Sequence, residues 1–453
     1  MKRAFTIIAV FAAASASAFA EERLDLRRDA IVKAVEKAAP AVVNISTERV
    51  VQRGFFFGDD NPFNDPLFDE FTRRFSRPEI ATSLGSGGIF SPDGYIFTNA
   101  HVVNRASKIM VTFADGSQHS ADLVNVDVAS DLAVIKVSVG KPLPVLVFGR
   151  SDDLMVGEKA IAVGNPFGLS SSVTEGVISA LHRDVVAEGR VLFKDILQTD
   201  ALINPGNSGG PLLNIFGEVI GVTTAMRADA QGIGFAIPVD RAKRSIGGLL
   251  DYRKGRRMSF GFDLEEKYVD SSPAVRLVVK SVDAAGPADK AGCKAGDVIL
   301  AVNGRQVSGV VDFMVAILSY REGEVKLSCS RGSRDVVLAV TPVTIPKPDP
   351  IKIARDLLGL GVQQMERALA PDVGVDIDKG ILISDVRKDS PAAGAGVMRS
   401  DIILQVNDAL TADLESFALA LESAAGGNKV YLVILRRKGS RIYQGPVEIT
   451  VRR

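Results

Sequence analysis

The middle of the chain alternates short apolar runs with turn residues. From residue 84 to residue 238, runs rich in Val, Ile, Phe and Ala are separated by Gly, Asp and Asn. Short runs bounded by such residues predict antiparallel strands. Apolar residues recur at helical spacing before and after this region, at residues 28–39 and 239–250. The pattern predicts a mainly β domain with some α, built as an antiparallel barrel fold and closed by a helix.

The C-terminal part of the chain contains an internal repeat. Residues 286–304 align with residues 390–408 after a shift of 104 residues, and nine of the 19 aligned positions are identical. Two copies at so long a period indicate duplicated domains rather than a solenoid. Residues 341–350 between them are rich in proline and predict a stiff spacer.

The first 80 residues carry two segments outside this pattern. Residues 1–20 have a charged start, a short apolar region and small residues that end in Ala-Phe-Ala, which is typical of a cleaved signal peptide. A membrane anchor is the alternative, although the apolar run is short for a span. Residues 53–80 mix Gly, Pro, Asn and Asp with many phenylalanines, which predicts an interaction surface or a packed aromatic flap.

Composition limits the classes of partner. The 54 basic residues equal the 54 acidic residues, so no large basic field points to nucleic acid. Cys293 and Cys329 could form one bridge in an exported protein, but one pair is no disulfide framework, and we expect both to be unpaired. The chain has no C-x-x-C or H-E-x-x-H motif, so no metal or other cofactor is expected.

The candidate chemistry lies in the barrel region. The run 206–211, Gly-Asn-Ser-Gly-Gly-Pro, has the composition of a nucleophile loop around Ser208, because its glycines let the backbone pass close to a reacting carbonyl. His101 follows one strand-like run, and Asp131 begins another 30 residues later. The order His, Asp, Ser is that of chymotrypsin-type barrels. We therefore predict a catalytic triad of His101, Asp131 and Ser208.

The backbone around the serine predicts an oxyanion hole formed by Gly206, Asn207 and Ser208. A turn without chemistry is the alternative. Three motifs in one order, each beside a strand, favour catalysis. His119 looks like a hairpin residue and His182 lacks a carboxylate pattern, so neither is the predicted base.

Further motifs resemble those of the HtrA (Deg) family of serine proteases. The resemblance covers about residues 28–453, and its motifs are Gly85–Ile89, Asp93–Tyr95, Thr98–His101, Asp131–Ala133, Gly164–Gly168, Gln198–Ala201 and Gly234–Pro238. It implies a chymotrypsin-like double β-barrel protease domain over residues 21–250 with a regulatory loop at 53–80. Two PDZ domains would follow, over residues 258–342 and 351–453.

The resemblance also implies an activity. We expect a periplasmic serine endopeptidase of protein quality control that degrades unfolded or damaged proteins. The alternative is chiefly a chaperone or peptide-binding scaffold with low proteolytic activity. The family further implies a homotrimer or a multiple of trimers, with the loop 53–80 at subunit contacts, and it allows contact with a membrane surface.

The primary specificity pocket can be located by the same resemblance. In trypsin-like barrels the base of this pocket lies just before the nucleophile, where this chain has Leu202 and Ile203. Ala225 and Met226 match the opposite wall in HtrA enzymes. A narrow apolar pocket suits valine, alanine or similar residues, whereas Asp200 is the alternative determinant and would select arginine.

Each copy of the repeat resembles a PDZ domain, which binds a chain end by adding it as a strand to an open sheet edge. The predicted peptide-binding residues are Phe260, Gly261 and Phe262 in the first copy and Leu358, Gly359 and Leu360 in the second. Residues 360–362 are an alternative register in the second copy. Because Ser400 and Asp408 replace turn glycines of the first copy, a purely architectural role for the second copy stays open. We expect hydrophobic peptide C-termini to bind the first copy.

Overall fold

A computed structural model gives the fold of the chain. It describes residues 27–49, 81–104, 106–165, 172–187, 190–204, 206–226, 232–269, 275–320, 322–370, 377, 379–407, 409–439 and 441–451. The predicted signal peptide at residues 1–20 and the predicted loop at residues 53–80 lie outside these residues.

The first barrel forms from residues 42–137. Its strands are β1 (Val42–Arg49), β2 (Ala81–Ser91), β3 (Tyr95–Thr98), β4 (Lys108–Thr112), β5 (Gln118–Asp127) and β6 (Leu132–Val137). They close in the order β1-β2-β3-β6-β5-β4, with every pair antiparallel. β6 is buried at five of its six positions, which is the near-continuous apolar run that its sequence Leu-Ala-Val-Ile-Lys-Val requires.

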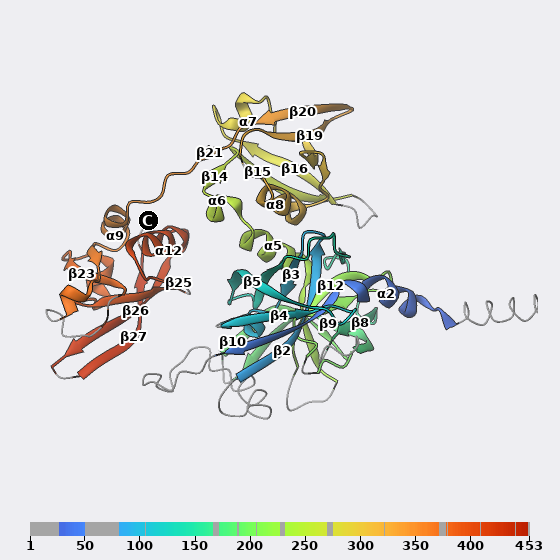
Figure 1. The fold of residues 1–453 in the computed structure, drawn as a ribbon, viewed down its shortest axis with the longest axis horizontal. Helices are drawn as coiled ribbons and strands as arrows, with labels where there is room; N and C mark the ends of the chain where they lie inside the picture. The colour runs from blue at the N-terminus through green and yellow to red at the C-terminus, as the bar shows by residue number, and fades with distance from the viewer. Residues whose placement is uncertain are drawn as a thin grey trace, which may run out of the picture. The chain divides into compact units, whose positions relative to one another are not determined.

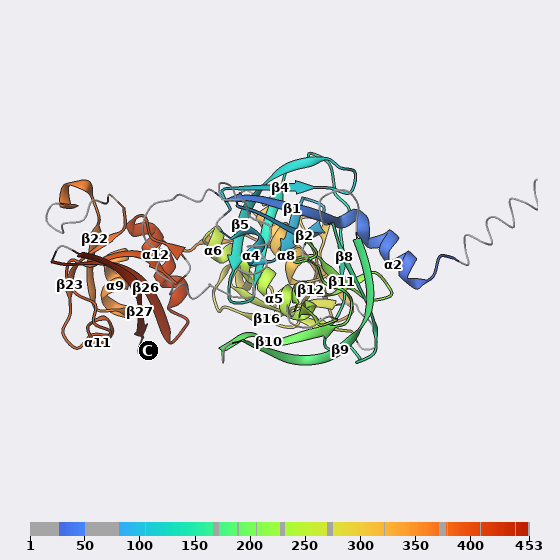
Figure 2. The ribbon, with the colours of Figure 1, turned by 90° about the horizontal axis from the view of Figure 1, so that it is seen from below.

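The second half of the protease region is a seven-stranded sheet. Its strands are β7 (Val147–Phe148), β8 (Lys159–Gly164), β9 (Ser172–Ala187), β10 (Arg190–Thr199), β11 (Pro211–Leu213), β12 (Glu218–Met226) and β13 (Gly234–Pro238). An additional pairing of β11 with β12 joins six of these strands into a ring. Figure 2 shows β1, β2, β4 and β5 gathered on one side of the domain and β9 and β10 on the other. The predicted double barrel is therefore present.

Helices flank this region as the sequence predicts. The helix α2 (Ala30–Ala38) begins at Asp29, whose side chain accepts a hydrogen bond from the Val32 amide, and η1 (Ala39–Ala41) follows it. The helix α5 (Val239–Leu249) follows β13 directly, and its buried residues pack on the barrel core. The short helices α4 (Ala100–Val103) and α6 (Tyr252–Gly255) complete the set.

The two copies of the repeat fold alike. The first contains β14 (Met258–Ser259), β15 (Phe262–Tyr268), β16 (Val275–Val282), α7 (Pro287–Lys290), β17 (Val298–Val302), β18 (Arg305–Gln306), α8 (Val310–Leu318), β19 (Val325–Arg331) and β20 (Arg334–Val340). After β21 (Val343–Thr344), the second contains α9 (Pro350–Leu357), β22 (Leu360–Gln364), η3 (Arg367–Leu369), β23 (Ile381–Val386), α11 (Pro391–Gly394), β24 (Ile402–Val406), β25 (Ala409–Leu410), α12 (Leu414–Ala424), β26 (Lys429–Lys438) and β27 (Arg441–Thr450). The sheet orders, β15-β16-β17-β19-β20 and β22-β23-β24-β26-β27, correspond strand by strand.

The chain divides into two compact units, Met1–Val343 and Thr344–Arg453 (Figure 1). The first unit contains the protease region and the first copy of the repeat, and one hydrophobic core runs through both. The second unit has its own core around Phe417, Leu421 and Leu432. Among the described residues, no helix is long and apolar enough to cross a membrane.

Candidate active site

His101 sits in the short helix α4, directly after the buried strand β3. Asn99, the residue before this helix, connects it to Asp131, because its side-chain amide donates a hydrogen bond of 2.9 Å to the Asp131 carbonyl oxygen. The His101 side chain is 20% exposed, so it stands at the edge of the core with access to solvent. The segments that carry His101 and Asp131 are therefore joined by this side-chain-to-backbone hydrogen bond as well.

Asp131 lies at the turn before β6 and holds the imidazole. Both of its carboxylate oxygens are 2.9 Å from His101 Nδ1, and Oδ1 also accepts the His101 amide at 3.1 Å. The Thr224 hydroxyl donates to Oδ2 at 2.5 Å. Asp131 has a φ of 52°, a left-handed conformation that turns its buried side chain toward the histidine. With Nδ1 engaged by the carboxylate, Nε2 is the ring nitrogen that can take up a proton.

The nucleophile loop packs against the segment that carries His101. The Ser208 carbonyl accepts a hydrogen bond of 2.8 Å from the Ser86 amide, and the Gly209 amide donates to the Thr223 carbonyl at 2.8 Å. Gly209 has a φ of 83°, and a Cβ there would collide with Thr98 Oγ1. Glycine is required at this position, since the loop comes this close to the end of β3. The structure thus packs the loop that holds Ser208 against the end of β3, which directly precedes the helix that carries His101.

The amides of the predicted oxyanion hole differ in their partners. The Asn207 amide donates a hydrogen bond of 3.0 Å to the Asn204 carbonyl, so it is already engaged within the turn. The amides of Gly206 and Ser208 donate to none of the residues that the structure describes. Gly206 has a φ of 100°, as expected for a glycine that turns the backbone here. Of the three predicted donors, only Asn207 has a partner among the residues that the structure describes.

The predicted pocket residues occupy different environments. Leu202 is 51% exposed, whereas Ile203 is buried against Gly234 of β13. Ala225 and Met226 lie at the end of β12, and their side chains are outside the described part of the structure. The Asp200 carboxylate accepts the Val177 amide at 2.6 Å, so it is held against the backbone of β9. This contact gives Asp200 a structural partner that its sequence position does not suggest.

The other histidines have their own partners. His119 on β5 packs edge-on against Phe113, with ring centroids 5.3 Å apart. His182, for which the sequence offers no carboxylate, lies 2.6 Å from Asp195 across the irregular β9–β10 ladder. Both His182 and Asp195 have positive φ, at 54° and 53°, and both side chains are largely exposed. The sequence misses this pair because bulges in the ladder, rather than regular strand spacing, bring the two residues together.

The predicted peptide-binding loops of the two copies have the same backbone geometry. Gly261 and Gly359 both have a φ of 74°. The Gly261 carbonyl accepts the Asp283 amide at 2.9 Å, and the Gly359 carbonyl accepts the Arg387 amide at 2.8 Å. The apolar residues on either side are buried in both copies: Phe260, Phe262, Leu358 and Leu360. The alternative register at residues 360–362 falls inside β22, so the first register matches the geometry of the first copy.

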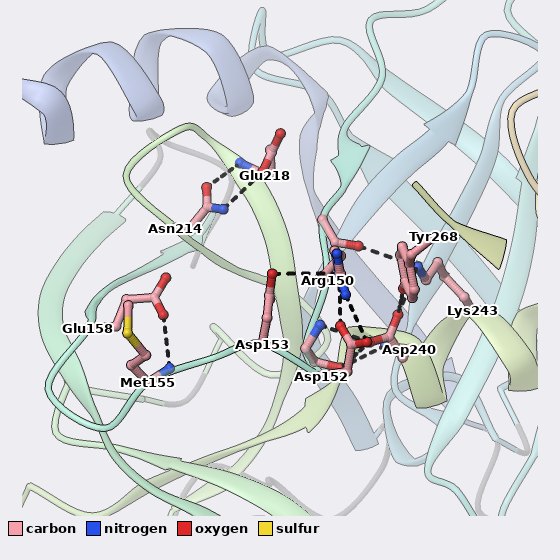
Figure 3. Close-up of polar contacts among 12 residues, drawn as sticks. Arg150, Asp152, Asp153, Met155, Glu158, Asn214, Glu218, Asp240, Lys243 and Tyr268 are labelled. Carbon is pink, nitrogen blue, oxygen red and sulfur yellow. Dashed lines mark hydrogen bonds and ion pairs between the residues drawn. The ribbon is translucent and has the colours of Figure 1, made fainter. Parts of the chain in front are cut away.

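A polar cluster that the sequence did not reveal joins α5 to the first PDZ copy (Figure 3). Asp240 accepts the Ser151 amide and hydroxyl, each at 2.8 Å, and it also accepts the Tyr268 hydroxyl. Lys243 Nζ lies 2.8 Å from both the Asp240 carboxylate and the Tyr268 hydroxyl. Burial alone would raise the pKa of Asp240, but hydrogen bonds from Lys243, Tyr268 and Ser151 lower it to about 2. The guanidinium of Arg150 stacks 4.0 Å from the centre of the Tyr268 ring.

Beside this cluster is a cavity of about 520 Å³. It is lined by residues of α5, of β15 and of the start of α8, including Arg244, Leu264 and Met314. Because β15 is the terminal strand of its sheet, the cavity borders the edge to which a PDZ ligand strand would add.

Cys293 and Cys329 are free thiols in the core of the first PDZ copy. Burial is the main cause that raises the pKa of Cys293 to about 11 and that of Cys329 to about 12. Neither thiol therefore ionises near neutral pH. No group of three or more metal-ligating side chains occurs in the described part of the chain.

Comparisons with known proteins agree with this organisation. The trypsin-like peptidase domain model matches residues 85–222, and the PDZ domain model matches residues 220–341 and 357–442. A DegP-like periplasmic serine endoprotease of Chlamydia trachomatis is 40% identical over 399 residues, which cover 84% of this chain and 80% of that protein. Another, from Ectopseudomonas mendocina, is 35% identical over 435 residues, which cover 89% of this chain and 90% of that protein.

A solved structure of the HtrA-type protease AlgW with a tripeptide is 34% identical, covers 70% of this chain and 98% of its own, and has a TM-score of 0.40. The family assignment rests on the sequence relatives, since they match at 35–40% identity over more than four fifths of the chain. The chain belongs to the HtrA/Deg family of serine endoproteases, with a trypsin-like protease domain followed by two PDZ domains.

Proposed function

We propose that this protein is an exported endopeptidase of protein quality control that cuts unfolded or damaged proteins with Ser208 as its nucleophile. The observation that carries the proposal is the contact of His101 Nδ1 with both oxygens of Asp131, at 2.9 Å each, beside the loop that holds Ser208. A buried carboxylate that orients a partly exposed imidazole is what a general base requires, and a scaffold without catalysis would not need it. This arrangement therefore supports the protease over the chiefly chaperone alternative.

The residues have the following roles in the proposed reaction. Ser208 Oγ attacks the carbonyl carbon of the scissile peptide bond while His101 Nε2 takes its proton. Asp131 keeps the imidazole in the reactive tautomer and stabilises the imidazolium that forms. His101 then protonates the leaving amine, and water hydrolyses the acyl-enzyme in a second round that uses the same base.

The amides of Gly206 and Ser208 would stabilise the negative charge on the tetrahedral intermediate. Each such donor contributes about 3–4 kcal/mol to the transition state. The Asn207 amide is left out of this role because it is bonded to the Asn204 carbonyl. Leu202 and Ile203 supply an apolar wall for the residue before the cut, which favours small aliphatic side chains.

The PDZ copies would supply the ligand sites. A hydrophobic C-terminus would add as a strand to the edge of β15, and its carboxylate would meet the loop at Phe260, Gly261 and Phe262. The corresponding residues Leu358, Gly359 and Leu360 would serve the second copy. The periplasmic names of the relatives support export through a signal peptide at residues 1–20. A homotrimer with the loop 53–80 at its contacts stays part of the proposal.

The proposed triad is tested by cleavage of reduced casein. We expect Ser208→Ala to abolish cleavage and Asp131→Asn to reduce kcat by about 10⁴-fold, because the imidazole would then adopt the wrong tautomer. His182→Ala is the matched control, because His182 also bonds to a carboxylate but lies outside the site, and it should retain the wild-type rate. Wild-type turnover by Ser208→Ala, with the fold intact by circular dichroism, would overturn the proposal.

A further inference from the structure

Ser86 is a fully buried serine on β2 whose polar atoms all meet other segments of the protease domain. Its amide donates to the Ser208 carbonyl at 2.8 Å, and its own carbonyl accepts the Thr98 hydroxyl at 2.8 Å. Its hydroxyl donates to the Gly206 carbonyl at 2.5 Å and accepts the Asn165 amide at 2.9 Å. One residue therefore contacts the end of β8, the end of β3 and the nucleophile loop.

The direction of these hydrogen bonds is fixed by their chemistry. A backbone amide can only donate, so the hydroxyl oxygen of Ser86 must accept from Asn165. The hydroxyl proton is then directed to the Gly206 carbonyl, which can only accept. The Asn165 amide is itself held in place, since the Asn165 carbonyl accepts the Asn44 side-chain amide at 2.8 Å. The donor to Gly206 is therefore anchored by the segment at the end of β8, which also packs against the nucleophile loop.

The peptide unit between Gly206 and Asn207 is held at both ends. Its carbonyl accepts the Ser86 hydroxyl, and its amide donates to the Asn204 carbonyl. This unit lies between the two amides that donate to no described residue, those of Gly206 and Ser208. Gly206 has no Cβ and a φ of 100°, so sterics alone would allow this peptide to rotate. The Ser86 hydroxyl supplies the directional contact that opposes such a rotation.

We infer that Ser86 is a positioning residue for the oxyanion hole. Its hydroxyl holds the Gly206 carbonyl on the buried side of the loop, so that the Gly206 and Ser208 amides stay directed at the reacting carbonyl oxygen. This inference rests on the proposed function, because it presumes that Ser208 is the nucleophile. Ser86 itself does not touch the substrate and transfers no proton.

The test is steady-state kinetics of the full chain on an amide substrate with valine before the cut. Ser86→Ala should lower kcat by roughly 10- to 100-fold, less than the loss of a whole oxyanion donor, while KM changes by less than about threefold. If Ser86 only stabilised the fold, Ser86→Ala would lower the fraction of active enzyme but leave kcat per active molecule unchanged. The active enzyme is therefore counted by titration with a fluorophosphonate. Affinity for a peptide boronate, which mimics the tetrahedral state, should fall by the same factor as kcat/KM.

Two further variants keep the test decisive. Ser86→Cys keeps a donor at this position, although a weaker one, so its kcat should lie between those of wild type and Ser86→Ala. It provides the test if the alanine variant unfolds. Ser91→Ala removes another buried hydroxyl of β2, one that donates to Asp93 at 3.3 Å instead of to the loop, and it should keep the wild-type kcat.

The outcomes separate the inference from the proposed function. Wild-type kcat and boronate affinity in Ser86→Ala and Ser86→Cys, with Ser208→Ala inactive, would overturn the role of Ser86 alone. Persistent activity of Ser208→Ala would instead overturn the proposed function on which the inference rests.

Discussion

The two PDZ copies share a buried ion pair at the central strand of the sheet, and the first copy also contacts the protease helix α5. In each copy a fully buried aspartate at the start of a central strand pairs with an arginine of a neighbouring strand: Asp297 with Arg331 at 2.7 Å, and Asp401 with Arg436 at 2.6 Å. Each arginine also donates to the carbonyl of a turn glycine, Gly292 or Gly396, at 2.7 Å. The repeat detected in the sequence therefore preserves a polar anchor as well as an apolar pattern.

The edges of the two copies have different surroundings. In the first copy, Tyr268 at the end of β15 bonds to Asp240 and Lys243 of the protease helix α5, and one apolar core continues from the protease region into this copy. The core of the second copy is a separate cluster. Because β15 is also the predicted ligand edge, a peptide bound there would meet residues of the protease domain directly. Both copies therefore contain the same buried ion pair, and in the first copy the edge strand β15 also contacts the protease helix α5.

Removing the aspartate of each buried pair should have the largest effect on stability. Asp297→Ala and Asp401→Ala each remove the carboxylate partner of an arginine that still bonds to a glycine carbonyl. The loss should be smaller than that for a fully buried pair, about 3–5 kcal/mol, because both arginines are partly exposed. We expect the smaller loss for Asp297→Ala, because the Arg331 side chain is 33% exposed against 19% for Arg436.

Calorimetry of the full chain checks this prediction. Asp401→Ala should shift only the transition of the second unit, and Asp297→Ala only that of the first. A shift of both transitions by either substitution would contradict the separation of the cores. Glu324→Ala, which changes an exposed carboxylate outside these pairs, is the control for a general effect of charge.

The contact between α5 and β15 should make the first unit sensitive to acid. The pKa of Asp240 is about 2, below its ordinary value of 3.8, so its stabilising contribution is present above pH 4 and is lost as the pH falls through about 2. This difference corresponds to about 2 kcal/mol in the free energy of unfolding.

Thermal unfolding between pH 4 and pH 2 measures this effect. Asp240→Asn should flatten the pH dependence of the first unit relative to wild type, while Asp413→Asn, an exposed helix cap of the second unit, should leave it unchanged. The same slope in wild type and Asp240→Asn would show that the cluster does not link stability to pH.

The smallest expected difference in stability between the two copies concerns their predicted peptide-binding loops. Gly261→Ala and Gly359→Ala both place a side chain at a φ of 74°, which costs about 1–2 kcal/mol. A Cβ at Gly261 would lie 2.9 Å from Pro287 Cδ, whereas a Cβ at Gly359 would collide with Ser390 Cβ. We therefore expect the greater loss of stability for Gly359→Ala, as measured by urea unfolding. Equal losses would mean that Ser390 moves aside freely.

Much of the fold was predictable because local sequence patterns determine its strands and helices. The alternation from residue 84 to 238 predicted the strands, and helical spacing predicted α2 and α5. The motifs around His101 and Asp131 predicted a contact that the structure has, because each residue sits in a recognisable motif beside a strand. The role of Ser208 stays a prediction.

The remaining features depend on contacts that no local pattern records. Ser86 meets Gly206 across 120 residues of chain, and its role depends on hydroxyl direction rather than on the Gly-Ser-Gly motif around it. Tyr268 bonds to Asp240 because the first PDZ copy packs on α5, a tertiary arrangement. The engaged amide of Asn207 depends on the path of one turn, which composition alone does not determine.

Site mapping of a fluorophosphonate adduct is the most direct test of the proposed catalytic triad. The full chain is incubated with the reagent in the presence of excess peptide with a hydrophobic C-terminus, and the modified residue is found by peptide mass spectrometry. We expect one adduct on Ser208, slow labelling of Asp131→Asn, and no labelling of Ser208→Ala. An adduct on another serine, or equal labelling rates in wild type and Asp131→Asn, would contradict the assignment of His101, Asp131 and Ser208 as the catalytic triad.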